Sequence, residues 1–152
     1  MEPAHPSPTI PKRPAVTLTD PQRAFLDRPL FAALATVDPD GSPRQAVIWY
    51  RLEPDGRILL NSRSGRRWPA NLERDGRVAL AVTDPADGYL WLGLTGRVDE
   101  VDDDLERARE DIVALAHRYR DEPTASSIAT FRSQPRISFR VAIDGVHDHL
   151  ED

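Results

Sequence analysis

The sequence contains no cysteine, and Lys12 is the only lysine among its 20 Lys and Arg residues. The absence of cysteine excludes disulfides, thiolate catalysis and cysteine-ligated metal sites. No apolar run approaches the roughly 18 residues that a membrane-spanning helix needs, and no segment has the pattern of a secretory signal. We therefore expect a cytoplasmic protein with no membrane partner.

Composition favours one globular domain that does not bind nucleic acid. The net charge is −5, whereas proteins that follow a phosphate backbone are usually basic. The chain has 152 residues, 39% of them hydrophobic and 30% charged, which is enough for a sizeable core. The many prolines of residues 1–16 predict a disordered tail, and residues 17–152 are expected to form the domain.

Apolar segments separated by turn sequences predict six β-strands. Turns such as Pro-Asp-Gly between apolar runs are typical of hairpins. The expected strands span residues 30–37, 43–52, 57–62, 77–83, 89–101 and 136–149. In the last strand, the alternation predicts that Ile137, Phe139, Val141 and Ile143 face the core and that Arg136, Ser138 and Arg140 face outward.

Three helices are expected beside these strands. The first begins at Thr19 or Asp20, where either side chain can cap it, and turns Phe25 and Leu26 toward the core. The second spans residues 66–76.

The third expected helix, residues 103–120, has an apolar stripe and capping-box spacing between Asp103 and Glu106. Residues 121–127 are expected to form a loop. Together, the elements predict an α+β fold, an antiparallel barrel with helices packed outside it.

Three arginines crowd the start of the second expected helix, namely Arg63, Arg66 and Arg67. The helix dipole makes cations unfavourable there unless an anion lies among them. A strand-to-helix turn also offers free backbone N–H groups to a phosphate, and Ser62, Ser64 and Gly65 suit such a turn. We predict that the phosphate of a ligand is this anion; solvated surface arginines are the alternative.

A flat cofactor that carries a phosphate also needs a slot for its ring. Residues 44–50 can line one wall, because Ala46 is small and a strand edge offers N–H and C=O groups. Four aromatic residues can supply stacking faces, although each is also compatible with core or dimer packing: Trp49, Trp68, Tyr89 and Trp91.

These features occur in the order "FAALATVDPDGSPRQAVIWY", "ILLNSRSGRRWPANLERDGRVALAV" and "GYLWLGLTGRVDEV". From Pro21 to Val146 the sequence resembles the split β-barrel flavin and deazaflavin oxidoreductases of the pyridoxamine 5′-phosphate oxidase-like superfamily. The most specific part is "GRRWPANLERDGRVAL", which is similar to the family's basic-x-x-Asn-Leu-x-x-Asp-x-Arg-Val block. Within the superfamily, the chain is most similar to the actinobacterial branch that uses the deazaflavin coenzyme F420.

The resemblance implies a homodimer with two cofactor sites at the subunit interface. It implies that the phosphate-binding part of the cofactor meets Ser62, Arg63, Ser64, Arg66 and Arg67, with Asn71 supporting the helix. It places the ring along Gln45, Ala46, Val47, Ile48 and Trp49, with Tyr89 and Trp91 approaching the ring or substrate. Many relatives carry a lysine where this chain has Trp68, so Arg66 and Arg67 are expected to supply the missing charge.

The implied activity is hydride transfer between F420 and a small unsaturated organic substrate, with Tyr50, Tyr89 or solvent as proton donor. An FMN flavoprotein on the same fold is one alternative, and a non-catalytic protein that binds a cofactor or tetrapyrrole is another. No metal site is expected, because His117, His147 and His149 lack the spacing of a metal triad and are interpreted as structural.

Overall fold

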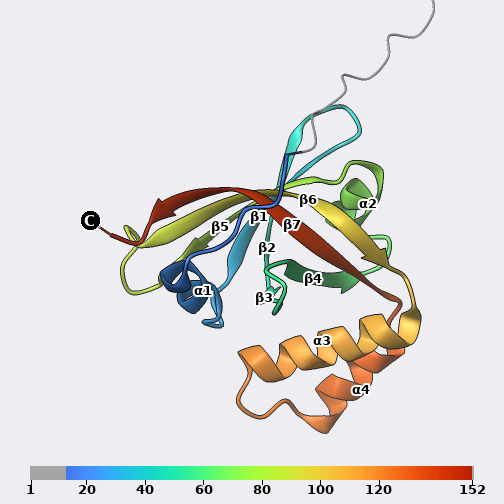
Figure 1. Cartoon of the computed structure of the whole chain (residues 1–152). Helices are drawn as coiled ribbons and strands as arrows, with labels where there is room; N and C mark the ends of the chain where they lie inside the picture. The colour runs from blue at the N-terminus through green and yellow to red at the C-terminus, as the bar shows by residue number, and fades with distance from the viewer. Residues whose placement is uncertain (1–12, 152) are drawn as a thin grey trace, which may run out of the picture.

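The computed structural model describes residues 13–151, which form one curled antiparallel sheet and four helices (Figure 1). The strands are β1 (Ala32–Val37), β2 (Pro43–Ile48), β3 (Arg51–Leu52), β4 (Ile58–Arg63), β5 (Arg77–Thr83), β6 (Trp91–Asp102) and β7 (Arg136–His149). The helices are α1 (Asp20–Leu26), α2 (Arg67–Arg74), α3 (Leu105–Tyr119) and α4 (Ala125–Ser133). Most of the expected tail, residues 1–12, lies outside the described residues.

The strand order in the sheet is β2-β1-β5-β6-β7-β4-β3, so β2 and β3 are its two edges. Strands β5 and β6 lie in the interior of the sheet, as their apolar sequences predict. The sheet is strongly curled, and α3 and α4 pack together at one end of it (Figure 1). The predicted α+β class and split-barrel architecture are confirmed.

The prediction of one continuous strand over residues 43–52 is wrong, because the segment breaks at Trp49 and Tyr50. Its first part pairs with β1 and its second part with β4, at the opposite edge of the sheet. The Tyr50 side chain is fully buried, and its hydroxyl donates to the Leu26 carbonyl over 2.9 Å. The Tyr50 N–H donates to the Tyr119 hydroxyl instead of a strand partner. The break brings the two edges of the sheet together and raises the number of strands from six to seven.

The first helix forms as its sequence predicts. Thr19 is the N-cap, and a reciprocal capping box joins it to Gln22. Phe25 and Leu26 are buried in the main core, which also contains Phe139 and Val141 of β7.

The outward assignment of Arg136 and Ser138 is wrong. Ser138 has no exposed surface, and Arg136 is only 9% exposed. This face of β7 lies under α3, and the Ser138 hydroxyl donates to the Asp111 carboxylate of that helix over 2.7 Å. An amphipathic helix has to cover some face of the sheet, and α3 covers this one.

The N-cap of the third helix lies one residue later than predicted. Asp104, not Asp103, is the N-cap, and its carboxylate accepts the Arg107 N–H. Leu105 of the predicted apolar stripe is 42% exposed, whereas Ala108, Ile112 and Leu115 are buried.

Helix α4 begins inside the segment that was expected to be a loop. Thr124 caps it by accepting the Ser127 N–H. No residue of α4 is buried. Its sequence also has no continuous apolar stripe from which a helix could be predicted. None of the helices within residues 13–151 is long and apolar enough to cross a membrane.

Candidate functional site

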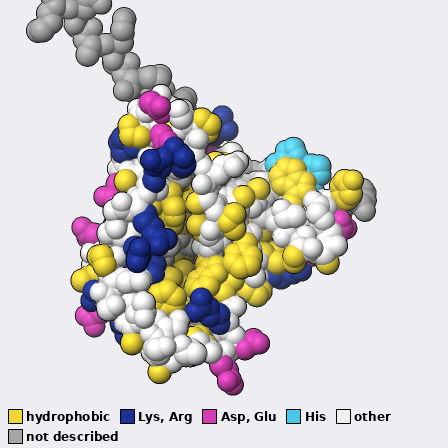
Figure 2. Space-filling model, turned by 180° about the vertical axis from the view of Figure 1, so that it is seen from behind, with side chains coloured by type: hydrophobic (Ala, Val, Ile, Leu, Met, Phe, Trp, Pro, Cys, Tyr) yellow, Lys and Arg dark blue, Asp and Glu magenta, His cyan; other side chains and the backbone are white. Residues whose placement is uncertain are grey.

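A cleft of about 460 Å³ lies where β2 faces β4 across the break. Helices α2, α3 and α4 complete its walls, together with the start of β7. Figure 2 shows a hollow with hydrophobic side chains inside and Lys or Arg side chains along one rim. This volume is within the usual range for small-molecule and cofactor pockets. The lining residues are Phe31, Ala46, Val47, Ile48, Trp49, Asn61, Ser62, Arg66, Trp68, Ile112, Arg120, Phe131 and Arg136.

Half of the predicted site residues line this cleft: Ala46, Val47, Ile48, Trp49, Ser62, Arg66 and Trp68. The other half do not line it in this single chain: Gln45, Arg63, Ser64, Arg67, Asn71, Tyr89 and Trp91. Gln45 and Trp91 line a separate hollow on the sheet. The Tyr89 side chain projects into solvent with 81% of its surface exposed.

The turn before α2 has the geometry of an anion-binding loop. Gly65 adopts φ +85°, a conformation that favours glycine. Arg66 is the N-cap of α2, yet its side chain makes no capping hydrogen bond, and the first turn contains no acidic residue. The first-turn N–H groups of α2 therefore have no side-chain cap, although this helix end favours an anion.

Sequence reasoning missed six residues of the cleft, and Arg136, the first residue of β7, is the buried cation among them. The other five are Phe31, Asn61, Ile112, Arg120 and Phe131. Its guanidinium lies 5.2 Å from the centre of the Phe131 ring. Two of its nitrogens donate hydrogen bonds, to the side-chain oxygens of Asn61 and Gln134. The third, Nε, is buried with no hydrogen-bond partner among the described residues.

Burial first, and then the nearby charges of Arg66 and Arg63, lower the pKa of Arg136 to about 10. Desolvation and repulsion both disfavour the charged form of this side chain. An anion in the cleft would favour the charged form and so offset both effects. The signal that could have found Arg136 is the apolar stripe of α3, because that helix covers the face on which Arg136 lies.

Some of the arginines elsewhere in the structure are paired with carboxylates. Seven of them form ion pairs: Arg28, Arg44, Arg51, Arg57, Arg77, Arg107 and Arg140. Within residues 13–151, Arg63, Arg66, Arg67 and Arg136 form none. The arginines around the cleft thus form a local positive region on an acidic chain.

Asn71 joins α2 to the end of β1. Its side-chain amide, 1% exposed, donates to the Thr36 hydroxyl over 3.1 Å and to the Asp38 carboxylate over 2.9 Å. Hydrogen bonds from Arg44 and then from Asn71 hold the pKa of Asp38 below its usual value. Asn71 therefore fixes the position of α2, and with it the arginines at the start of that helix.

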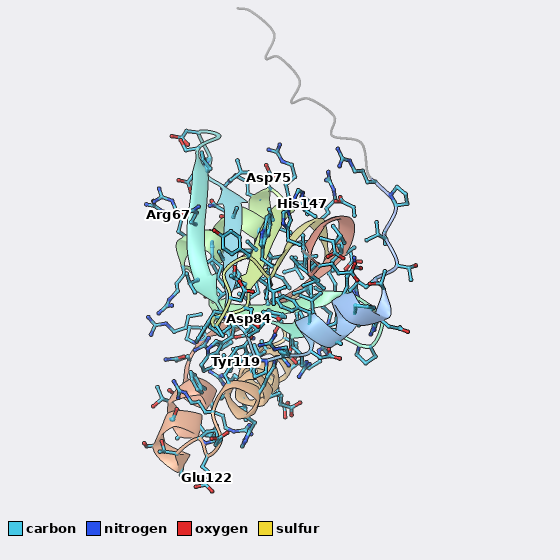
Figure 3. All side chains as sticks on the ribbon, turned by 90° about the vertical axis from the view of Figure 1, so that its left-hand side faces the viewer. Arg67, Asp75, Asp84, Tyr119, Glu122 and His147 are labelled. Atoms are coloured by element: carbon cyan, nitrogen blue, oxygen red, sulfur yellow. The ribbon has the colours of Figure 1, made fainter. Side chains whose placement is uncertain are left out.

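Aromatic side chains form the wall of the cleft opposite α2. Trp49 stacks on Tyr119 with ring centres 5.1 Å apart and planes 5° from parallel. The Arg120 guanidinium lies 5.2 Å from the Trp49 ring centre and 5.9 Å from that of Phe131. Tyr119 itself is fixed, since its hydroxyl lies 2.6 Å from the Leu30 carbonyl oxygen. Figure 3 shows Tyr119 where the helical hairpin meets the sheet.

The protein matches the pyridoxamine 5′-phosphate oxidase family over residues 18–149. The chain belongs to this family. Its structure is similar to that of an F420 reductase, with a TM-score of 0.70 and 25% identity over 86% of this chain and 98% of that one. None of the curated protein sequences matches it significantly.

Two further solved structures share the fold of this pyridoxamine 5′-phosphate oxidase family member. A conserved hypothetical protein from Mycobacterium tuberculosis aligns with a TM-score of 0.62 and 23% identity, over 92% of this chain and 91% of that one. The heme storage protein HutZ from Vibrio cholerae aligns with a TM-score of 0.64 and 20% identity, over 85% of this chain and 93% of that one. At these identities the likeness concerns the fold.

In this family member, the structure shows what surrounds Trp68, the residue expected to stand in place of a lysine. Trp68 is 9% exposed and packs against Phe139, with ring centres 6.0 Å apart. The indole forms part of the floor of the cleft and carries no charge. The charged side chains that line the cleft are those of Arg66, Arg120 and Arg136.

The tyrosines considered as proton donors lie away from the cleft. Tyr50 is fully buried with its hydroxyl on a backbone carbonyl, and burial raises its pKa. Tyr89 is exposed and does not line the cleft. Within a single chain, solvent is therefore the remaining candidate among the three proton sources considered.

Proposed function

We propose that this protein is an oxidoreductase that binds coenzyme F420 in the cleft and transfers a hydride between it and a small unsaturated organic substrate. Membership of the family and the similarity to an F420 reductase support this proposal. The observation that carries it is Arg136, a buried guanidinium with an unpartnered Nε, no paired carboxylate and Arg66 as its neighbour. A buried cation in this state favours an anionic ligand.

The residues of the cleft fit the two ends of such a cofactor. Arg136, Arg66 and the Ser62 hydroxyl would hold a phosphate, because guanidinium groups bind phosphate oxygens through paired N–H donors. The free backbone edge of β2 at Ala46 and Ile48 would meet the heterocycle. When bound, the cofactor supplies a two-electron hydride reservoir.

The protein contributes orientation and exclusion of water. Trp68 and Ile112 provide apolar surface under the ring position, and the Trp49–Tyr119 stack closes the side toward α3. Since neither candidate tyrosine lies at the cleft, the proton that accompanies the hydride comes from solvent. A substrate with an electron-poor C=C or C=N bond would accept both.

We also propose that the protein is a homodimer, as the family resemblance implies. A hollow of about 490 Å³ on the sheet surface is lined by small side chains of β1, β5 and β6, including Ala33, Ala35, Ala79 and Ala81. A hollowed apolar surface of this kind is typical of a contact with another molecule. Gln45 and Trp91 line the same hollow, so in this arrangement they would reach the cofactor through a partner subunit.

The decisive test of the proposed function is a pair of fluorescence titrations of ligand-free protein, one with F420 and one with FMN. Tight F420 binding with weak FMN binding supports the proposal, and turnover of enone acceptors with reduced F420 completes it. Tight FMN binding alone would assign the protein to the flavin alternative. Binding of neither, with tight binding of hemin, would favour the tetrapyrrole-binding alternative.

Light scattering tests the dimer separately. We expect twice the mass of the chain for the natural protein. The variant Ala79→Arg, which places a charge in the hollow, should dissociate toward monomer, whereas Ala24→Arg on exposed α1 should not. A monomeric natural protein would contradict the dimer.

A further inference from the structure

Two histidines meet at the end of β7, outside the cleft of this chain, and one of them, His147, also lines the hollow on the sheet. His147 and His149 are two residues apart on one strand, so their side chains leave the same face of the sheet. Their Nε2 atoms lie 2.7 Å apart, and both residues are exposed. Figure 3 shows His147 in the upper part of the sheet, well away from Tyr119 and Glu122.

Neighbouring residues on β6 hold the two rings in place. The Trp91 indole stacks on both imidazoles, with ring centres 5.1 Å from His147 and 4.7 Å from His149. In the register of the two strands, Gly93 is opposite His147. A Cβ atom at Gly93 would lie 2.9 Å from the Trp91 ring and 3.3 Å from the His147 Cβ, so a larger residue would disturb the stack.

We propose that His147 and His149 chelate one divalent transition-metal ion of the class that prefers imidazole ligands. At a metal–nitrogen distance of about 2.0–2.1 Å, two ligands at a right angle lie about 3 Å apart, so the nitrogens need little separation. Both rings have to turn, however, so that their lone pairs converge on the ion. Affinity at a site of nitrogen ligands follows the order Ni²⁺ < Cu²⁺ > Zn²⁺, and Cu²⁺ is therefore the tightest expected ion.

The hydrogen bond between the rings already brings both Nε2 nitrogens close together. Without a metal, the Nε2–H of one ring donates to the Nε2 lone pair of the other. When a metal ion binds, the proton of the donor ring moves through solvent from Nε2 to Nδ1 of the same ring. Both imidazoles stay neutral, and each presents an Nε2 lone pair to the ion.

The rest of the coordination shell is open. No group of three or more potential His, Cys, Asp or Glu ligands occurs within the described part of the chain. Asp148, between the two histidines, faces the other way and accepts a hydrogen bond from the Gln22 side chain over 2.9 Å. Water or a small exogenous ligand would fill the remaining positions, so the site is an open chelate rather than a closed structural site.

The test is a titration of untagged, full-length protein with CuCl₂, followed by Trp fluorescence and by calorimetry. Trp91 stacks on both rings, so bound Cu²⁺ should quench its emission. We expect His147→Ala and His149→Ala each to raise the dissociation constant at least about tenfold. Trp91→Phe should lose most of the quenching yet keep the calorimetric signal.

Two matched controls separate this site from other histidines. His117→Ala changes an exposed histidine of α3, and His5→Ala changes the one near the N-terminus; neither should alter the dissociation constant. Unchanged Cu²⁺ affinity in both His147→Ala and His149→Ala would overturn the proposal. The F420 titration of His149→Ala is an independent measurement, because His149 lines neither the cleft nor the hollow on the sheet.

Discussion

Arg63 of β4 and Arg136 of β7 are directly opposite each other in the antiparallel sheet. Like charges in this position destabilise a sheet, and here one of them is also buried. Neither forms an ion pair within residues 13–151. An arrangement that costs stability in the free protein is typical of a ligand-binding site, where the ligand supplies the missing charge.

Replacing Arg136 with methionine should change the stability of the protein and its affinity for the cofactor in opposite directions. Arg136→Met keeps most of the side-chain volume and removes a buried charge with an unpartnered donor, so we expect the free protein to gain about 1–2 kcal/mol of unfolding free energy. Binding of the phosphate-bearing cofactor should weaken by about 1–3 kcal/mol, the worth of a charge-assisted hydrogen bond. Urea unfolding of ligand-free protein and cofactor titration measure the two effects.

The matched control is Arg132→Met, an exposed arginine in the last turn of α4. It should change neither quantity by more than about 0.5 kcal/mol. If Arg136→Met loses stability and binds the cofactor as before, Arg136 is a structural residue and the phosphate assignment fails.

Arg66 and Arg67 are neighbours at the start of α2, but the structure gives them different expected effects. Arg66 lines the cleft and Arg67 does not, although both are exposed. We expect Arg66→Ala to weaken cofactor binding by about 1–3 kcal/mol and Arg67→Ala by clearly less. Fluorescence titration of the two variants measures the difference, and each serves as the other's control.

Equal losses in Arg66→Ala and Arg67→Ala would indicate a diffuse positive field rather than direct contact. No loss in either would return both residues to the alternative of solvated surface arginines. Arg74, a later arginine of α2, is unsuitable as a control, because it donates to the Asn71 side chain and to the Val37 carbonyl.

Local chemistry explains which parts of the fold could be predicted from the sequence. The turns after Val37 and Leu52 each contain the sequence Pro-Asp-Gly, which is typical of hairpins. Thr19 caps α1 through a capping box of four residues. The crowding of Arg63, Arg66 and Arg67 before α2 is likewise a local feature. Each of these signals lies within a few residues of the structure that it predicts.

The errors come from contacts between distant segments. The break at Tyr50 depends on the Leu26 carbonyl and the Tyr119 hydroxyl, which are far away in the sequence. The burial of Arg136 depends on the helices that pack over β7, one of which, α4, has no apolar stripe. The pattern of a single strand shows alternation, but it does not show which of its faces a helix will cover.

Asn71 should be essential for the stability of the α2 end of the protein. Asn71→Leu leaves the buried Thr36 hydroxyl without its amide donor, and we expect a loss of about 1–3 kcal/mol at neutral pH. Urea unfolding measures it. Glu73→Gln, on the exposed side of the same helix, is the control and should have almost no effect. A neutral Asn71→Leu variant would contradict the anchoring role.

The hydrogen bond from Asn71 to Asp38 should make the stability of the protein depend on pH in the acid range. Its pKa in the folded protein is held below 3.8, first by Arg44 and then by Asn71. The stabilising effect is therefore complete above the unfolded value of 3.8 and is lost as the pH falls through the lower folded value. Asn71→Leu removes one of the two hydrogen bonds, so its stability should decrease less steeply than that of the natural protein as the pH falls below about 4.

Alkaline pH should destabilise the protein through Tyr50. Burial raises the pKa of this fully buried phenol well above its usual value of 10.0. Above pH 10 the unfolded chain releases the phenolic proton while the folded protein retains it, so stability is complete below pH 10 and falls as the pH rises. The expected slope is about 1.4 kcal/mol per pH unit for this one group.

The variant Tyr50→Phe isolates this contribution. At pH 8 it should cost only about 0.5–1.5 kcal/mol, since the Leu26 carbonyl keeps the Arg118 guanidinium as a donor. Between pH 10 and 11 its unfolding free energy should decline less steeply than that of the natural protein. Tyr89→Phe, at an 81% exposed position, should reproduce the natural slope. Parallel slopes for all three proteins in urea unfolding would show that Tyr50 ionises in the folded state as readily as in the unfolded chain.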